Sequence, residues 1–296
     1  MIPIGGGSSK KRILRPDFLI LGLIAVTSLL LVGGILPFNF QTSPNDNAEY
    51  MPNEIDPAGG DSSLQLKPIT FKKCSSTAAI DFLVDNSGSM NFGTKMPSLK
   101  KGLLSFTGQL ADESIIGMQS FSTSPIEIVP VSYYKDVSSK MTMAINSMTG
   151  LSATHTKNAF VFTQGKLDLA MQKYPDKKFV LIFISDGIPE TGASNGACNG
   201  GIGGPFCTGD PLQPGKCRCF APEQDPTDIA NQIKAKGVRI FTIAYVDTSD
   251  SHLNEKLQTL MRNVASSSND YYMAPDDTKI GEILSQISVK ICENTK

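Results

Sequence analysis

Two segments of the chain are nearly continuous apolar runs of strand length, Ala79–Val84 and Phe179–Ile184. Runs of this length that end in polar residues predict strands buried on both faces, as in a parallel sheet. Elsewhere apolar residues recur at helical spacing, as in Leu99, Leu103 and Phe106. Buried strands therefore alternate with amphipathic helices along the chain.

This alternation predicts an α/β fold with a doubly wound, mainly parallel central sheet flanked by helices. The further expected strands are 114–120, 126–131, 238–246 and 271–273. The expected helices are 97–111, 137–148, one between Thr154 and Pro175, one from Asp225-Pro226 to Gly237, 252–264 and 280–291.

An uncharged apolar run from Phe18 to Leu36 precedes this domain. A helix of that length spans roughly the 30 Å hydrocarbon core of a bilayer, so residues 18–37 are predicted to form a transmembrane anchor. Basic residues cluster in 1–17, and the next one after the run is Lys67. The positive-inside rule then makes 1–17 a cytoplasmic tail and predicts a single-pass membrane protein whose remaining residues lie outside the cytoplasm.

A cleaved secretory signal is the alternative for this run. Its apolar region would be shorter, about 7 to 15 residues, and a small-x-small cleavage site would follow it. The run instead continues into Leu36-Pro37-Phe38, which favours an uncleaved anchor. Residues 38–73 contain little apolar material and are predicted to be a flexible extracytoplasmic linker to a domain spanning 74–296.

Polar residues follow the two buried strands at the point where each ends. Asp85-Asn86-Ser87-Gly88-Ser89 follows the first, and Ser185-Asp186-Gly187 follows the second. Ligands of open α/β sheets bind beyond the carboxyl ends of the strands, so both loops should face one crevice. Hard oxygen donors with few charges suit Mg²⁺, with Mn²⁺ or Ca²⁺ as alternatives.

With Thr154 in the intervening segment, this set resembles the metal-ion-dependent adhesion site (MIDAS) of von Willebrand factor type A (vWA) domains. The resemblance covers roughly residues 76–293 and implies a vWA, Rossmann-like fold with one reversed strand. It implies that three hydroxyls bind the ion and that two carboxylates act directly or through water. The implied ligands are Ser87, Ser89 and Thr154 for the hydroxyls and Asp85 and Asp186 for the carboxylates.

Six cysteines in a chain expected outside the cytoplasm predict disulfides. Cys74 and Cys292 flank the domain, and domain termini often lie close together, so we expect them to pair. The other four, Cys198, Cys207, Cys217 and Cys219, lie in a glycine-rich insertion at about 191–221. Cys217 and Cys219 each reach Cys198 or Cys207 more easily than one another. A zinc site is the rival interpretation, but paired Cys-x-x-Cys motifs are missing.

The leading functional hypothesis is a membrane-tethered, extracytoplasmic adhesion module. Its metal ion would be completed by an Asp or Glu of a protein partner, and its insertion would shape partner selectivity. A net charge of −1 argues against nucleic acid as a partner. With only His155 and His252 as histidines and no glycine-rich phosphate loop, we expect no enzyme activity. The alternative is a scaffold subunit of a pilus-like assembly machine, which would not need ion-dependent recognition.

Overall fold

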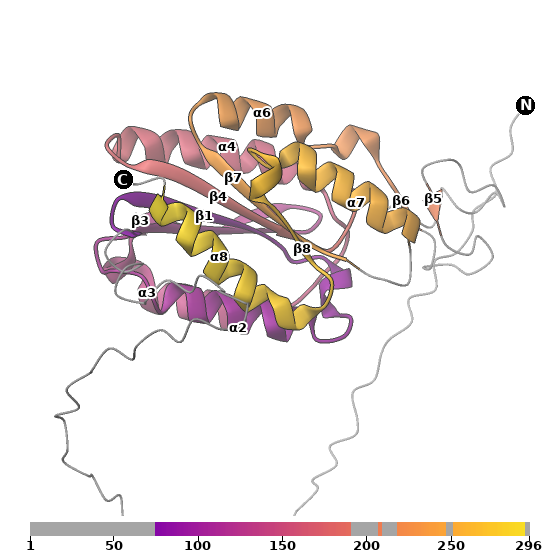
Figure 1. The fold of residues 1–296 in the computed structure, drawn as a ribbon, viewed down its shortest axis with the longest axis horizontal. Helices are drawn as coiled ribbons and strands as arrows, with labels where there is room; N and C mark the ends of the chain where they lie inside the picture. Colours follow the sequence, from indigo (N-terminus) through magenta and orange to yellow (C-terminus); the bar gives the residue numbers. More distant parts are fainter. Residues whose placement is uncertain (1–74, 191–206, 209–217, 247–250, 294–296) are drawn as a thin grey trace, which may run out of the picture. The chain divides into compact units, whose positions relative to one another are not determined.

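The computed structural model describes residues 75–190, 207–208, 218–246 and 251–293. A six-stranded sheet with strand order β3-β2-β1-β4-β7-β8 forms the centre (Figure 1). Its neighbouring strands are parallel except β2 and β3, which form an antiparallel pair. The strands are β1 (Ala78–Asp85), β2 (Ile115–Phe121), β3 (Pro125–Tyr133), β4 (Lys178–Ser185), β7 (Arg239–Tyr245) and β8 (Tyr271–Ala274). The predicted mainly parallel sheet and the reversed strand are thus confirmed.

Helices cover both faces of the sheet (Figure 1). The α-helices are α2 (Lys95–Thr107), α3 (Tyr134–Ser147), α4 (Thr156–Lys173), α6 (Thr227–Ala235), α7 (Ser251–Val264) and α8 (Ile280–Glu293). The 3-10 helices are η1 (Gly88–Asn91), η2 (Pro222–Gln224), η3 (Ser268–Asp270) and η4 (Asp277–Lys279). One hydrophobic cluster joins the sheet to α2, α3 and α8, and a second joins it to α4, α6 and α7. The predicted doubly wound architecture is therefore observed.

Strand β1 shows why the sheet is buried on both sides. Ile80 and Phe82 belong to the cluster with α2 and α8, whereas Ala79 and Leu83 belong to the opposite cluster. All of its residues are buried. Its register with β4 pairs Val84 with Ile184, so the two central strands end side by side. The loops that follow these strands are therefore brought together by the sheet itself.

Local signals at the ends of α6 agree with the sequence. The Asp225 carboxylate accepts a hydrogen bond from the backbone N–H of Thr227 at 2.8 Å, which caps the first turn. Gly237 follows the helix with φ +87°, a conformation that favours glycine. The helix begins at Thr227, so Asp225-Pro226 precedes it rather than forming its first turn.

The prediction of a membrane protein requires correction. No helix among residues 75–190, 218–246 and 251–293 is long and apolar enough to cross a bilayer. The predicted anchor at 18–37, the tail at 1–17 and the linker at 38–73 lie outside the described residues. Membrane attachment and an extracytoplasmic location are therefore withdrawn.

Only three of the six cysteines, Cys207, Cys219 and Cys292, lie within the described residues. Cys292 is buried on α8 and disulfide-bonded. Cys74, Cys198 and Cys217 lie outside the described residues, so the Cys74–Cys292 pairing stays a prediction. The short strands β5 (Cys207–Thr208) and β6 (Arg218–Cys219) pair antiparallel, with Cys207 opposite Cys219. That register agrees with a Cys207–Cys219 disulfide, which is one of the two pairings expected for Cys219. The pairing stays a prediction.

Candidate metal centre

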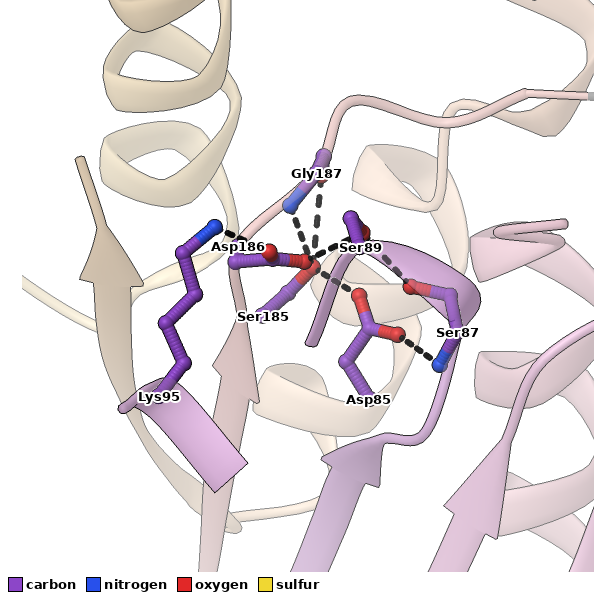
Figure 2. A network of polar contacts seen from close by, with 7 residues as sticks. All are labelled: Asp85, Ser87, Ser89, Lys95, Ser185, Asp186 and Gly187. Atoms are coloured by element: carbon purple, nitrogen blue, oxygen red, sulfur yellow. Dashed lines mark hydrogen bonds and ion pairs between the residues drawn. The ribbon is translucent and has the colours of Figure 1, made fainter. Parts of the chain in front are cut away.

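Asp85 is the last residue of β1, and its carboxylate is fully buried. Its Oδ1 accepts a hydrogen bond from the backbone N–H of Ser87 at 2.8 Å. Its Oδ2 accepts one from the hydroxyl of Ser185, the last residue of β4, at 2.5 Å (Figure 2). The side chain is thus fixed between the ends of the two central strands, as their register requires.

In the loop after β1, the hydroxyl of Ser87 faces Ser89 and that of Ser89 faces Asp186 (Figure 2). Ser89 Oγ donates to Asp186 Oδ1 at 2.7 Å, and Ser87 Oγ lies 3.0 Å from Ser89 Oγ. Because a hydroxyl has one hydrogen, Ser87 is the donor in the second contact. Oxygens almost a hundred residues apart in the chain therefore form one connected row.

Thr154 lies beside this row and is 3% exposed. A Cβ added to Gly187 would meet Thr154 Oγ1 at 3.4 Å and Ser89 Oγ at 3.8 Å. The threonine and serine hydroxyls therefore border the same small space, which the missing side chain of Gly187 leaves open. All five predicted ligand residues are thus gathered at one edge of the sheet.

Backbone hydrogen bonds hold the Thr154 loop against the loop after β1. The N–H of Gly88 donates to the carbonyl oxygen of Ser152 at 3.0 Å. The N–H of Leu151 donates to the carbonyl oxygen of Asn86 at 2.7 Å. The Asn91 amide adds two bonds to the backbone of Gly150, at 2.7 and 3.0 Å. The relative position of these two loops is therefore set by backbone hydrogen bonds and by Asn91 rather than by the candidate ligands alone.

Asp85 lies in an unfavourable environment for negative charge. Burial, and secondly the charge of Asp186, raises the pKa of Asp85 to about 7. A divalent cation among these oxygens would offset both effects. Serine and threonine hydroxyls with two carboxylates are the hard donors that Mg²⁺, Mn²⁺ and Ca²⁺ accept, so the residues fit such an ion.

The nature of the site also follows from what does not surround it. Within the part of the chain that the structure describes, no three His, Cys, Asp or Glu residues are grouped to hold a metal. The candidate centre therefore depends on hydroxyl oxygens for most of its donors. His155 takes no part in the network: its backbone N–H donates to Ser122, and its Nε2 has no hydrogen-bond partner among the described residues. The side chain of His252 lies outside the described residues.

Sequence reasoning missed two members of the network. Ser185 immediately precedes Asp186, and its position as the last residue of a buried strand was an available signal. Lys95, the first residue of α2, places its Nζ 2.6 Å from Asp186 Oδ2 (Figure 2). No spacing rule connects a lysine at a helix start with an aspartate so distant in the chain.

This fold and this cluster define an α/β domain with a polar cluster beyond the carboxyl ends of the central strands, where ligands of open α/β sheets bind. The family model of the von Willebrand factor type A domain matches residues 80–286, and the chain belongs to that family. A comparison with curated proteins finds no match.

Solved structures share the fold at low sequence identity. The pilus adhesin SpaC of Lactobacillus rhamnosus GG is 17% identical with a TM-score of 0.55, over 74% of this chain and 31% of SpaC. The vWF domain of the type V pili tip protein Mfa5 of Porphyromonas gingivalis is 17% identical with a TM-score of 0.52, over 74% of this chain and 97% of that domain.

A third neighbour was solved with zinc in its MIDAS motif. Proximal thread matrix protein 1 from the mussel byssus is 15% identical with a TM-score of 0.51, over 73% of this chain and 48% of that protein. The chain thus spans about a third of the SpaC structure and about half of the mussel protein.

Proposed function

We propose that this protein is a binding module that recognises a protein partner through a divalent metal ion. One observation carries the proposal: residues from three separate loops meet at the carboxyl edge of the sheet. Ser87, Ser89 and Asp186 are joined there by contacts of 3.0 and 2.7 Å. Membership of the vWA family supports it, because that family includes domains with such a site.

In this proposal the hydroxyls of Ser87, Ser89 and Thr154 hold the ion, and Asp85 and Asp186 supply its negative charge. Mg²⁺ is the ion we favour, with Mn²⁺ and Ca²⁺ as alternatives. When bound, the ion offers an open coordination position to an oxygen ligand. The partner fills it with the carboxylate of an Asp or Glu. Ser185 keeps Asp85 oriented, and Gly187 keeps the space between Thr154 and Ser89 open.

The biological role we propose is adhesion, and we propose no enzymatic activity. The support is the likeness to a pilus adhesin and to a pilus tip domain, each at 17% identity. A scaffold subunit of a surface appendage is the alternative, and such a subunit would tolerate loss of the ion. The two functions therefore differ in whether partner binding needs the metal.

Calorimetric titration of the purified chain with Mn²⁺ tests the metal centre. Asp85→Ala and Asp186→Ala should each abolish binding while circular dichroism shows a folded domain. Asp112→Ala is the matched control because Asp112 is exposed and lies away from the network. Retention of wild-type Mn²⁺ binding by Asp85→Ala would rule out the proposed site.

A further inference from the structure

Within the described part of the chain, Lys95 forms the one ion pair made by a candidate ligand. Its Nζ lies 2.6 Å from Asp186 Oδ2, with the Lys95 side chain 18% exposed and that of Asp186 fully buried. The other oxygen, Asp186 Oδ1, accepts the hydroxyl of Ser89. The lysine therefore takes the outer oxygen of the carboxylate and leaves the inner one facing the serines (Figure 2).

Helix stability does not account for a lysine at this position. Lys95 is the first residue of α2, and the first turn of that helix contains no acidic residue. The N-terminus of a helix carries partial positive charge, so a cation there is unfavourable. Local rules that are broken in this way are expected at functional sites.

We infer that Lys95 is a positioning and specificity-determining residue, which gives the metal-loaded centre a net positive charge and so selects a carboxylate as the partner's ligand. This inference rests on the proposed function. Asp85 and Asp186 together carry the charge that a divalent ion cancels. With Lys95 in contact with Asp186, one positive charge is left over in a site that is largely shielded from solvent.

In this role the lysine has opposite effects on metal binding and on ligand binding. It competes with the ion for the negative charge of Asp186, so it weakens metal binding. It also leaves the loaded centre cationic, so it strengthens capture of an anionic ligand. A lysine that only stabilised the loop would strengthen both steps, because both need the same ordered oxygens.

Mn²⁺ and acetate are the probes that separate these effects in the 296-residue chain. Electron paramagnetic resonance of free Mn²⁺ gives the metal affinity. Water-proton relaxation of the Mn²⁺-loaded protein gives the acetate affinity, because acetate displaces metal-bound water. For Lys95→Met we expect the dissociation constant of Mn²⁺ to fall on the order of tenfold and that of acetate to rise on the order of tenfold.

Two further variants serve as controls. Lys95→Arg keeps the charge and should stay within about threefold of wild type in both measurements, given its similar reach. Lys101→Met removes an exposed lysine of the same helix and should change neither. Lys95→Gln, a second variant without the charge, carries the same test if Lys95→Met does not fold.

The outcomes separate this inference from the function on which it rests. Wild-type protein that binds no Mn²⁺ would overturn the proposed function and the role of Lys95 with it. Wild-type protein that binds Mn²⁺ and acetate, with both affinities lowered or both unchanged in Lys95→Met, would overturn the inference alone. Opposite shifts of the two constants would support it.

Discussion

Asp81 is a buried carboxyl group that the candidate metal centre does not use. It lies on β1 on the same face of the sheet as Asp85 and is 1% exposed. Gln119 donates to its Oδ1 at 3.0 Å, while its Oδ2 has no hydrogen-bond partner among the described residues. Gly117 lies opposite on β2, and a Cβ there would come within 2.7 Å of Asp81 Oδ1, so glycine makes room for the carboxyl group.

Burial raises the pKa of Asp81 to about 7, which predicts a pH-dependent loss of stability. Between about pH 4 and 7 the folded chain holds a proton that the unfolded chain has released, so stability falls as pH rises. Asp81→Asn removes this group. Between pH 5 and 7, the free energy of unfolding should fall more steeply with pH in wild type than in the variant. We expect the two slopes to differ by on the order of 1 kcal/mol per pH unit. Urea unfolding of the metal-free proteins at these pH values measures the two slopes. Equal slopes in wild type and variant would contradict the prediction.

At the residue scale, the sequence predicted which residues would meet but not how they would be held. The positions of Asp85, Ser87, Ser89, Thr154 and Asp186 followed from strand ends and from a family resemblance, and the structure gathers them. Lys95 was missed because ion pairs between distant residues leave no periodic signal. That these residues bind a metal remains a prediction.

The segment that carries Thr154 is the element on which the site's geometry depends most. Gly150 lies against the loop after β1, where a Cβ would meet the carbonyl oxygen of Ser87 at 2.3 Å. No side chain fits there without moving one loop away from the other. The Asn91 amide bonds to Gly150 from the same side, so the two loops behave as one unit.

Gly150→Ala should therefore weaken both the candidate metal centre and the fold. We expect a free energy of unfolding lower by about 1–3 kcal/mol, from overpacking, and Mn²⁺ affinity lower by roughly tenfold or more. Gly165→Ala is the matched control, because Gly165 lies within α4 with no atom within 4 Å of an added Cβ. It should stabilise the chain by about 0.5–1 kcal/mol without changing metal affinity. Equal Mn²⁺ affinity in both variants would contradict this role of Gly150.

Element boundaries show where periodicity fails as a guide. The predicted helix 97–111 ends at Thr107, although the apolar pattern continues to Leu110. Leu110 is buried from the segment after the helix, so core contact rather than helical geometry explains its apolar character. The reversal of β3 was expected from the family alone, since parallel and antiparallel strands share the same alternation.

At the scale of the whole molecule, the site lies at the edge of a core that does not depend on it. The central strands are buried by helices on both faces, and the candidate ligands begin where those strands end. Removing a ligand should leave the hydrophobic clusters intact. The metal should therefore act on stability as a ligand of the folded state rather than as part of the fold.

Because the ion and a proton compete for Asp85, metal should stabilise the protein more at pH 8 than at pH 5.5. The pKa of Asp85 is raised to about 7, chiefly by burial, so below that pH the ion must displace a proton and its affinity falls. Metal at a hundred times its dissociation constant at pH 8 adds about 2.7 kcal/mol. The same concentration at pH 5.5 should add roughly 1 kcal/mol, since affinity falls about tenfold per pH unit.

Thermal or urea unfolding with Mg²⁺ and with chelator, at both pH values, measures this difference. Asp85→Asn carries no proton to displace and should show little stabilisation by Mg²⁺ at either pH. Its metal-free form should also equal or exceed wild type in stability at pH 8, because a buried charge has been removed. Stabilisation of wild type by Mg²⁺ to the same extent at pH 5.5 and pH 8 would mean that the ion binds without displacing a proton from Asp85, and it would contradict the role proposed for that carboxylate.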